Sequence, residues 1–539
     1  MKKILVIRSA RLKEVSFVIN DLKDKYPISY ISVLTQRGVI EKLKKNEKID
    51  ELIVHDKWKG KFNIFKMGIK EIKNIRDKRF DVAVVVHNNV DGRGYLHLDM
   101  LIYLTGAKEK IFYGLSGHSY RYTLSGVFFS GIRIVLELIL LLSLPLLLSL
   151  FFFVNLLRKK NKKSSKEKVC MLLNNPAKYI FYDSRVIKEA KTLGNKGYEV
   201  VILVIDDGTK DLNRWNEFNV ISVALYPHDL LSLCDLFLLR EAIKQRADAY
   251  HSHDLNSLLA GYIASKINNA RLIYDAHELW TGYGYCKQKL EAFKLKFLEK
   301  TLIKRVDRVL TVNDSIANEL ERKYNIKRPL ILMNCASLNN CNNSRSIDLK
   351  RIGKGDKIIL YIGVLGSGRG LEEVIESAKY IKEGSIVFMG YGELEEKLRR
   401  MAEELQLTSR IKLVKPVPSE KVVSVASTAD VGIVPIKGIS LSYYLCAPNK
   451  LFQCLLAGLP VVASNLPELR KIIKENDLGE LFDPEDPKSI ADAINNVLSK
   501  KERYDQIKEN VKRIAKEKYN WERESLKLLR MYEELTRKN

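Results

Sequence analysis

The sequence predicts an α/β protein that contains three parallel sheets and one hydrophobic membrane segment. Strand and helix patterns alternate in residues 1–122, 168–345 and 346–539, which predicts parallel sheets covered by helices on both faces. A chain of 539 residues is too long for a single core, because domains usually hold about 150 residues. Each of the three parts is therefore expected to form a Rossmann-like domain.

The chain is strongly basic, with 91 Lys and Arg residues against 65 Asp and Glu residues and a formal charge of +26. This excess predicts an anionic partner, such as nucleic acid, anionic lipid or a phosphorylated substrate. No nucleic-acid partner is expected, because zinc-type Cys/His spacing is absent and both charge signs alternate on helical faces, as in residues 393–404. The seven cysteines are scattered without a CxxC pair, which fits reduced thiols in a cytosolic setting.

Residues 1–122 contain the segments KKILVIRSARLKEVSFVINDLKDKYP, IDELIVHD and FDVAVVVH. These segments resemble the N-terminal half of heptosyltransferase-type (family 9) glycosyltransferases. Lys13, Glu14 and Val15 stand where that family has an acidic residue in its first strand-to-helix loop, and no partner domain follows to close a cleft. We therefore expect no independent second active site here.

Four polar residues follow a predicted strand of this first part: His87, Asn88, Asn89 and Asp91. They lie where open α/β sheets bind ligands, although the polarity of an ordinary loop explains them equally well.

A membrane segment is predicted at residues 124–157. Residues 138–157 carry no charge over about 20 positions, the length that crosses the hydrocarbon region of a bilayer. The basic linker 158–167 follows directly, which places the C-terminal side in the cytoplasm and suits anionic lipids. One crossing would put the first domain outside the cell, whereas a re-entrant hairpin broken at Pro145 would keep both soluble parts on the cytoplasmic side. Both arrangements stay open.

The stretch YYLCAPNKLFQCLLAGLPVVAS, residues 443–464, predicts a loop, a helix and a buried strand. Pro448 marks the start of the helix, and Gly458 and Pro460 mark its end. The N–H groups and partial positive charge of its N-terminus, together with Lys450, suit an anionic ligand such as a diphosphate.

The segments PNKLFQ and AGLPVVAS resemble the donor site of family 4 glycosyltransferases, which are retaining enzymes of the GT-B fold. The resemblance runs from about Val169 to the C-terminus. It implies an acceptor-side domain at 168–345, a nucleotide-sugar-binding domain at 346–539 and a last helix that crosses back onto the first domain. The polar segment 334–346 is expected to be the linker between them.

Acceptor-side residues are expected at strand ends of the first half, where an open sheet binds its ligand. The segments YDSRVIKEAK, AYHSHDLNS and IYDAHELW supply Asp183, Arg185, His253, Asp254, His277 and Glu278. By the resemblance, Asp183 and Arg185 lie at the mouth of the cleft and His277 lies close to the transferred sugar. Helix capping explains Asp183 equally well.

Donor-binding residues are expected in the second half. The loop GVLGSGRG brings Gly366, Gly368 and Arg369 to a diphosphate, since glycines allow a close backbone approach and arginine pairs with phosphate. The resemblance adds Gly390 and Gly392, in a turn under the nucleotide, and Asn449 and Gln453 in the helix.

Three positions depart from the family pattern. Val364 stands at the first of two basic positions, and Leu445 and Gln453 stand at the positions of two acidic residues. These departures make a non-catalytic GT-B subunit an alternative, and a nucleotide-sugar epimerase of the same fold is another.

We predict a membrane-associated glycosyltransferase at the cytoplasmic face of the cell membrane. It would move a sugar from a nucleotide-sugar to a lipid-linked or cell-envelope polysaccharide acceptor, with His277, Arg369 and Lys450 as catalytic residues. Retention, and the absence of any metal or other cofactor, are implied by the resemblance.

Overall fold

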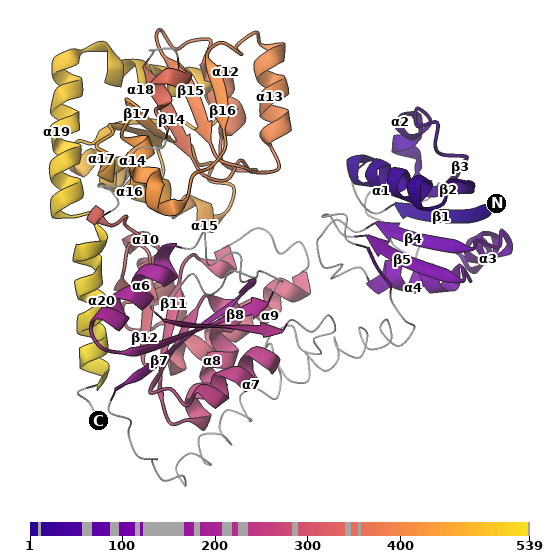
Figure 1. Ribbon diagram of the computed structural model, residues 1–539, viewed down its shortest axis with the longest axis horizontal. Coiled ribbons are helices and arrows are strands. Elements are labelled where there is room, and N and C mark those ends of the chain that lie inside the picture. Colours follow the sequence, from indigo (N-terminus) through magenta and orange to yellow (C-terminus); the bar gives the residue numbers. More distant parts are fainter. Residues whose placement is uncertain are drawn as a thin grey trace. The chain divides into compact units, whose positions relative to one another are not determined.

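The computed structural model (Figure 1) describes residues 1–8, 12–55, 67–86, 96–113, 119–121, 166–176, 184–206, 218–224, 236–282, 289–339, 347–353 and 357–536. The chain divides into two compact units, Met1–Leu140 and Leu141–Asn539. The sheets of both units are parallel, as predicted, except for one antiparallel edge strand in the first unit.

The first unit contains one sheet with the strand order β3-β2-β1-β4-β5-β6. All neighbours are parallel except β6, which is antiparallel to β5. The described strands are β1 (Lys2–Arg8), β2 (Ser29–Gln36), β3 (Glu51–His55), β4 (Val82–Val86), β5 (Glu109–Tyr113) and β6 (Ser119–Arg121). The described α-helices are α1 (Leu12–Lys25), α2 (Ile40–Leu43), α3 (Ile69–Asp77) and α4 (Leu96–Leu104).

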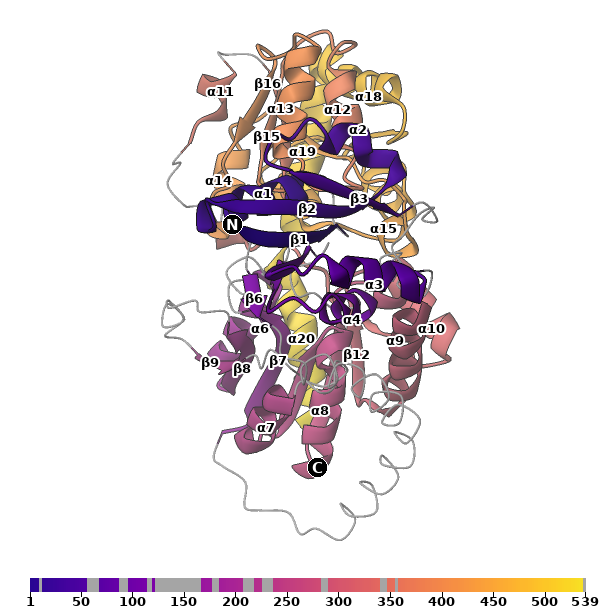
Figure 2. The same ribbon diagram turned by 90° about the vertical axis from the view of Figure 1, so that its right-hand side faces the viewer.

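Helices cover both faces of this sheet because successive apolar residues of each strand point to opposite faces, so both faces must be buried. Ile4 and Val6 of β1 pack with Val15 and Ile19 of α1, whereas Leu5 and Ile7 belong to the core under α3 and α4. Figure 2 shows α1 and α2 on one side of the strands and α3 and α4 on the other. This part is therefore a doubly wound α/β sheet. Its resemblance to family 9 stays a prediction.

The second unit holds two parallel sheets. In the first, the order is β13-β12-β11-β10-β7-β8-β9, with every neighbouring pair parallel. Its strands are β7 (Lys168–Pro176), β8 (Glu199–Asp206), β9 (Asn219–Ala224), β10 (Ala249–His253), β11 (Arg271–Ala276), β12 (Arg308–Thr311) and β13 (Leu330–Ile331). Its helices are α6 (Ser184–Asn195), α7 (Leu236–Gln245), α8 (Leu255–Ile267), α9 (Lys289–Leu302) and α10 (Asp314–Tyr324), with the short 3-10 turn η5 (Trp280–Gly282).

The other sheet of this unit has the order β16-β15-β14-β17-β18-β19 and is also parallel. Its strands are β14 (Ile358–Ile362), β15 (Ser385–Met389), β16 (Ile411–Val414), β17 (Val431–Val434), β18 (Val461–Ser464) and β19 (Gly479–Phe482). Its helices are α11 (Leu349–Ile352), α12 (Leu371–Ser377), α13 (Glu395–Glu404), α14 (Val422–Ala426), α15 (Leu441–Tyr444), α16 (Asn449–Leu456), α17 (Pro467–Glu475), α18 (Pro487–Ser499) and α19 (Lys501–Glu517).

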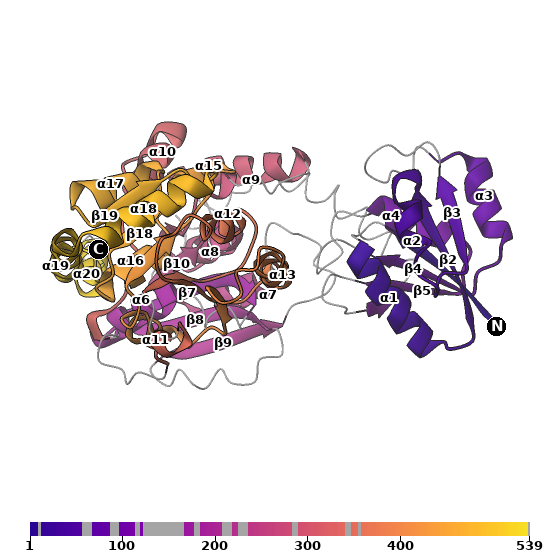
Figure 3. The same cartoon turned by 90° about the horizontal axis from the view of Figure 1, so that it is seen from above.

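The last helix, α20 (Trp521–Thr536), crosses back onto the first half of the second unit, as predicted. Its residues Leu528, Met531 and Tyr532 pack into the core formed by β7, β8 and α6, whereas Ile507 and Val511 of α19 pack on the second half. Figure 3, seen from above, shows α19 and α20 nearly end-on at one side of the unit.

The segment that joins the two halves is anchored in its first residues. Cys335 is fully buried in the core of the second half, and the side chain of Lys188 in α6 donates to Oδ1 of Asn334 at 2.7 Å. The backbone N–H of Trp521 donates to the carbonyl of Ala336 at 3.0 Å. The predicted linker 334–346 is therefore packed rather than exposed over residues 334–336, while residues 340–346 lie outside the described part.

None of the helices in the described residues is long and apolar enough to cross a bilayer. The predicted membrane segment 124–157 lies outside the described residues, and so does the predicted linker 158–167 except for its last two residues. Span and re-entrant hairpin both stay predictions.

Candidate active site

Close backbone packing shapes the carboxyl edge of the second half, where strands β14 and β15 end. The N–H of Gly363 donates to the carbonyl of Met389 at 3.0 Å, and that of Leu365 donates to the carbonyl of Tyr391 at 2.8 Å. A Cβ atom on Gly390 would lie 1.9 Å from the carbonyl oxygen of Gly363. These two loops therefore approach so closely that glycine is required.

The other glycines predicted here differ in what they require. A Cβ on Gly392, at φ +155°, would lie 2.3 Å from the carbonyl oxygen of Leu365. Gly368 has φ +79° and lies against Ile439, whereas a Cβ on Gly366 would meet only Val364, at 3.5 Å. The backbone geometry thus requires glycine at positions 368 and 392, whereas a side chain would fit at position 366.

Lys450 lies at the N-terminal end of α16, with its ammonium directed at this edge. Its Nζ lies 3.7 Å from the centre of the Tyr361 ring, and a Cβ on Gly363 would be 3.6 Å from it. Only 7% of the residue is exposed, and among the described residues no carboxylate pairs with it. Burial, aided by the positive charge of Arg369, holds the pKa of Lys450 well below its usual range.

Arg369 completes this group of cations. Its guanidinium lies over the ring of Tyr443, 5.0 Å from the ring centre. Asn449, at the first position of α16, is exposed, and Gln453 is half-buried one turn later on the same helix. Pro448 is the N-cap of α16, one position before the helix proper.

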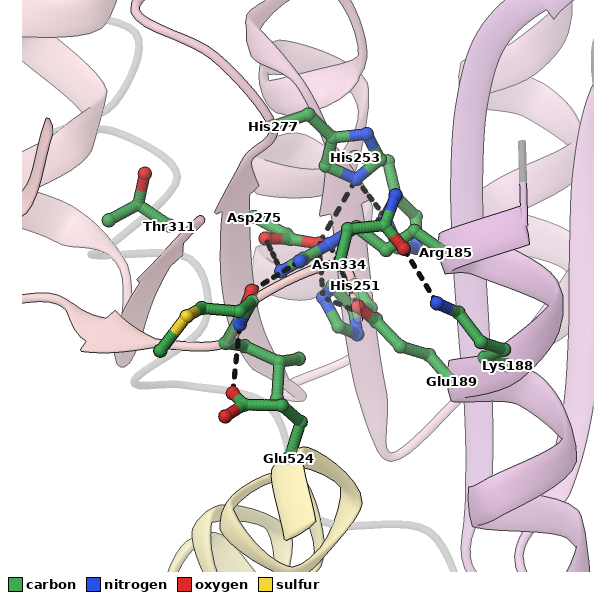
Figure 4. A network of polar contacts seen from close by, with 12 residues as sticks. Arg185, Lys188, Glu189, His251, His253, Asp275, His277, Thr311, Asn334 and Glu524 are labelled. Carbon is green, nitrogen blue, oxygen red and sulfur yellow. Dashed lines mark hydrogen bonds and ion pairs between the residues drawn. The ribbon is translucent and has the colours of Figure 1, made fainter. Parts of the chain in front are cut away.

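A buried polar network lies at the strand ends of the first half (Figure 4). The guanidinium of Arg185 donates to both oxygens of Asp275, at 2.8 and 2.7 Å, and lies 3.0 Å from Oε1 of Glu189. It also donates to the carbonyl of Leu332 at 2.5 Å. Burial alone would raise the pKa of Asp275, but Arg185 and His277 hold it well below its usual range.

Two histidines meet the same carboxylate. Nε2 of His277 lies 3.1 Å and Nδ1 of His253 lies 3.3 Å from Oδ2 of Asp275, and the two ring nitrogens are 3.0 Å apart. The backbone N–H of His277 donates to Oδ1 of Asp254 at 3.0 Å. Asp254 itself has φ +64°, and burial raises the pKa of its carboxyl. The side chain of His277 stays 16% exposed at the rim of this otherwise buried network.

His251 lies behind this pair. Its ring stacks on that of His253, with centres 4.5 Å apart, and its Nδ1 lies 3.0 Å from the hydroxyl of Tyr532 in α20. Burial and the neighbouring His253 keep the pKa of His251 well below its usual range. His251 is therefore a neutral internal residue.

Glu189, His251, His253 and Asp275 are close enough to hold a metal ion, with ligand atoms within 4.8 Å of one another. The guanidinium of Arg185, however, already pairs with both carboxylates. A second cation at the same place would be repelled by this charge.

The two halves of the second unit are in direct contact. The side-chain amide of Asn313 donates to the carbonyl of Leu445 at 2.9 Å, and the hydroxyl of Ser315 donates to Glu468 at 2.6 Å. Leu445 packs against the core of the first half. Burial raises the pKa of Cys446 to about 11, and the negative charge of Glu278 adds to that shift.

Two family models match the second unit. The model described as Glycosyltransferase Family 4 matches residues 184–333, and the model described as Glycosyl transferases group 1 matches residues 344–514. The uncharacterized glycosyltransferase MJ1607 of Methanocaldococcus jannaschii is 23% identical over 64% of this chain and 91% of its own length. A D-inositol 3-phosphate glycosyltransferase of Corynebacterium urealyticum is 31% identical over 26% of this chain and 31% of its own length.

Solved structures of other proteins share the fold. Sucrose-phosphate synthase of Thermosynechococcus elongatus covers 69% of this chain and is itself covered completely, with a TM-score of 0.57 and 16% identity. HepE of Anabaena, in complex with UDP and glucose, covers 68% of this chain over its whole length, with a TM-score of 0.55 and 16% identity.

The chain is a glycosyltransferase of the GT-B fold.

Within this glycosyltransferase the structure groups the predicted site residues into two sets. Gly368, Arg369, Gly390, Gly392 and Lys450 gather at the carboxyl edge of the second half. His253, Asp254 and His277 gather at that of the first half, with Arg185 buried behind them. Asp183 lies outside the described residues.

Arg185 differs from its predicted place at the mouth of the cleft. Only 1% of it is exposed, and it contacts Asp275, Glu189 and Leu332 inside the first half. The direct role of Arg185 in this glycosyltransferase is thus to hold Asp275. The prediction that it contacts an acceptor stays untested.

Sequence reasoning missed Asp275, Glu189, Tyr361 and Tyr443. A signal for Glu189 was present, since Arg185 and Glu189 are four residues apart on one face of α6. Asp275 stands two residues before His277 at the end of β11, where a carboxylate on a buried strand needs a partner. The two tyrosines carry no such signal, because an aromatic residue in a strand or a loop is usually part of a core.

Proposed function

We propose that this glycosyltransferase moves a sugar from a nucleotide-sugar to a lipid-linked or cell-envelope polysaccharide acceptor, with retention of configuration, at the cytoplasmic face of the cell membrane. The observation that carries the donor half of this proposal is the buried ammonium of Lys450, which has no carboxylate partner among the described residues. Such a cation is stabilised when an anion enters beside it.

A diphosphate fits this place for steric and electrostatic reasons. Gly363, Gly390 and Gly392 keep side chains away from the loops around Lys450, so a ligand can approach the backbone. Arg369 adds a guanidinium that can bind two phosphate oxygens at once. Together, Lys450 and Arg369 would stabilise the negative charge that develops on the leaving nucleoside diphosphate.

His277 is proposed to contact the transferred sugar. Its ring is held on Nε2 by Asp275 and His253 and stays partly exposed. A histidine fixed in this way presents the rest of its ring in one orientation, which favours contact with a sugar hydroxyl over nucleophilic attack. We propose no metal or other cofactor for the reaction.

The nucleotide and the sugar are open to test, and UDP-glucose is a reasonable first donor because HepE was solved with UDP and glucose. Leu445, packed against the core of the first half, supplies no carboxylate at the position where the family often has one. Gln453 can hydrogen-bond a ribose hydroxyl without charge. These features suit a donor that is held mainly through its diphosphate.

The acceptor half of the proposal rests on the sequence. The apolar segment 124–157 and the basic linker 158–167 would bring the enzyme to an anionic membrane that carries a lipid-linked acceptor. A relative named amylovoran biosynthesis glycosyltransferase, from Erwinia amylovora, supports a polysaccharide acceptor.

The test is binding of a panel of nucleotide-sugars to the full-length chain, followed by transfer to lipid extracts. We expect one donor to bind, and both binding and transfer to fall in Arg369→Ala, while the exposed Arg399→Ala leaves them unchanged. Failure of every donor to bind a folded chain would reject the proposal. The product's anomeric configuration, read by NMR, decides retention. Fractionation of the chain with and without residues 138–157 decides membrane attachment.

A further inference from the structure

At the carboxyl edge of the sheet of the first unit, two polar side chains have buried atoms without a hydrogen-bonding partner. Nε of Arg8, the last residue of β1, and Oγ1 of Thr35, near the end of β2, are both shielded from solvent and without a partner. Thr35 is 0% exposed. Among the described residues no carboxylate pairs with Arg8.

Register and alternation place these two residues side by side. Ile7 of β1 is paired with Leu34 of β2, so Arg8 and Thr35 are neighbours one position beyond that pair. Ile4 and Val6 precede Arg8 on the face that is packed by α1, and Ile31 and Val33 precede Thr35 on the same face. Both side chains therefore belong to the α1 face, at the carboxyl edge of the sheet.

The N-terminal end of α1 lies at the same edge. This helix of 14 residues begins at Leu12, shortly after β1 ends, and packs back over β1 with Val15 and Ile19. Its first N–H groups and the positive end of its dipole favour an anion. On the opposite face of the sheet, where Ile53 and His55 of β3 point, Nε2 of His55 pairs with Glu71 at 2.7 Å.

The strand order also indicates that the carboxyl end of β1, which carries Arg8, is a place where ligands bind. The order β3-β2-β1-β4-β5 reverses direction between β1 and β4, and Arg8 is paired there with Val86. Open α/β sheets bind ligands at the carboxyl ends of the strands at such a switch point.

We propose that Arg8, Thr35 and the N-terminal end of α1 bind the oxyanion group of a small ligand, either a phosphate or a carboxylate. The guanidinium of Arg8 would bind two oxygens of the group, and the hydroxyl of Thr35 would donate to one of them. Burial lowers the pKa of Arg8, which an adjacent anion would reverse. This site lies outside the second unit and is independent of the proposed transfer reaction.

Hydrogen–deuterium exchange of the full-length chain, read by mass spectrometry, tests the site. The ligands are inorganic phosphate, acetate and chloride at equal ionic strength. We expect phosphate, acetate or both to slow exchange in peptides from residues 2–36, and chloride to have no effect. Slowing by phosphate alone assigns the phosphate class, slowing by acetate alone assigns the carboxylate class, and slowing by both assigns a site that accepts either oxyanion.

Two variants test whether the side chains of Arg8 and Thr35 cause the slowing of exchange. Thr35→Val replaces a hydroxyl that has no hydrogen-bonding partner by a methyl group of similar size, and Arg8→Lys keeps the charge without the planar fork, so both are expected to fold. We expect both to lose most of the phosphate-dependent or acetate-dependent slowing in residues 2–36. Arg369→Ala is the control for the donor site in the second unit and should leave this slowing intact.

Two results would overturn the proposal: no slowing in residues 2–36 with any oxyanion, or equal slowing in the wild type and in both variants. Donor binding, when followed by the same exchange measurement, is read in peptides from residues 361–392, so failure here and failure of the proposed function give different patterns.

Discussion

The ammonium of Lys450 lies 3.7 Å from the centre of the Tyr361 ring and is almost completely buried. A desolvated cation gains about 2 kcal/mol from an aromatic face, which is less than the cost of taking an ammonium out of water without a partner. The unliganded site is therefore destabilised, as the low pKa of Lys450 indicates. A donor diphosphate would remove this penalty.

Donor binding should take up a proton when the pH lies above the lowered pKa of Lys450. In the free enzyme this lysine is neutral in that range, although an ordinary lysine stays protonated up to about pH 10.5. A bound diphosphate favours the ammonium and raises its pKa, so affinity should fall as the pH rises through this window. Calorimetry in buffers of different ionisation enthalpy measures the proton uptake.

The control for this linkage is Lys450→Met, which fills a similar volume without a charge. Its donor binding should be weaker and free of proton uptake. At a pH below the lowered pKa of Lys450, the variant should also be at least as stable as the wild type, because a buried unpaired cation is removed. A clearly less stable Lys450→Met chain would mean that Lys450 has a structural partner.

Arg369→Ala should weaken donor binding by about 10- to 100-fold, because a hydrogen bond to a charged group contributes about 1.5–3 kcal/mol. Arg369→Lys should recover part of this loss, since the charge remains but the planar fork is missing. Titration of the donor into each variant gives the two values. An equal loss in Arg399→Ala, which lies exposed on α13 and pairs with Glu395, would contradict a local role for Arg369.

Gly390→Ala should damage both folding and donor binding, while Gly366→Ala should be tolerated. The added methyl at position 390 would lie 1.9 Å from the carbonyl oxygen of Gly363, whereas at position 366 it would meet only Val364 at 3.5 Å. Overpacking of this kind costs about 1–3 kcal/mol. Urea unfolding and donor titration of the two variants, made and measured together, provide the comparison. Similar behaviour of both would show that the β14 and β15 loops can separate easily.

Most of the fold could be predicted from the sequence because its strands are short apolar runs between helical patterns. The runs at 169–173, 358–362 and 461–464 are fully or almost fully buried central strands, and such strands in parallel sheets read as continuous apolar runs. The crossing of α20 onto the first half followed from the family resemblance and is confirmed by Met531 and Tyr532 in its core.

On the donor side of the site, the sequence predicted the glycines and the charged residues but not their aromatic neighbours. Gly368, Gly390 and Gly392 were identified, and their backbones do need glycine. The tyrosines beside Lys450 and Arg369 could not be identified, since only the folded arrangement brings Tyr361 and Tyr443 under these cations.

The acceptor side was predicted less well because its polar residues form a network across several elements. His253 and His277 were identified from their place at strand ends, but their common partner, Asp275, was not. The family resemblance placed Arg185 at the mouth of the cleft, but it is buried, and two of its partners, Asp275 and Leu332, stand 90 and 147 positions away. Pairing over such distances leaves no local pattern.

Asp275→Asn should destabilise the second unit by about 3–5 kcal/mol at neutral pH, because it leaves the buried guanidinium of Arg185 without its main counter-charge. Asp275 has a lowered pKa in the folded state, so its contribution is complete above the unfolded value of about 3.9 and is lost as the pH falls through the folded value. The stability difference between wild type and variant should therefore stay constant from neutral pH down to about pH 5 and shrink only in stronger acid. Urea unfolding across this pH range measures it, with the exposed Asp505→Asn as a control expected to change stability by less than about 0.5 kcal/mol. A difference that disappears already near pH 6 would instead assign the titration to one of the neighbouring histidines.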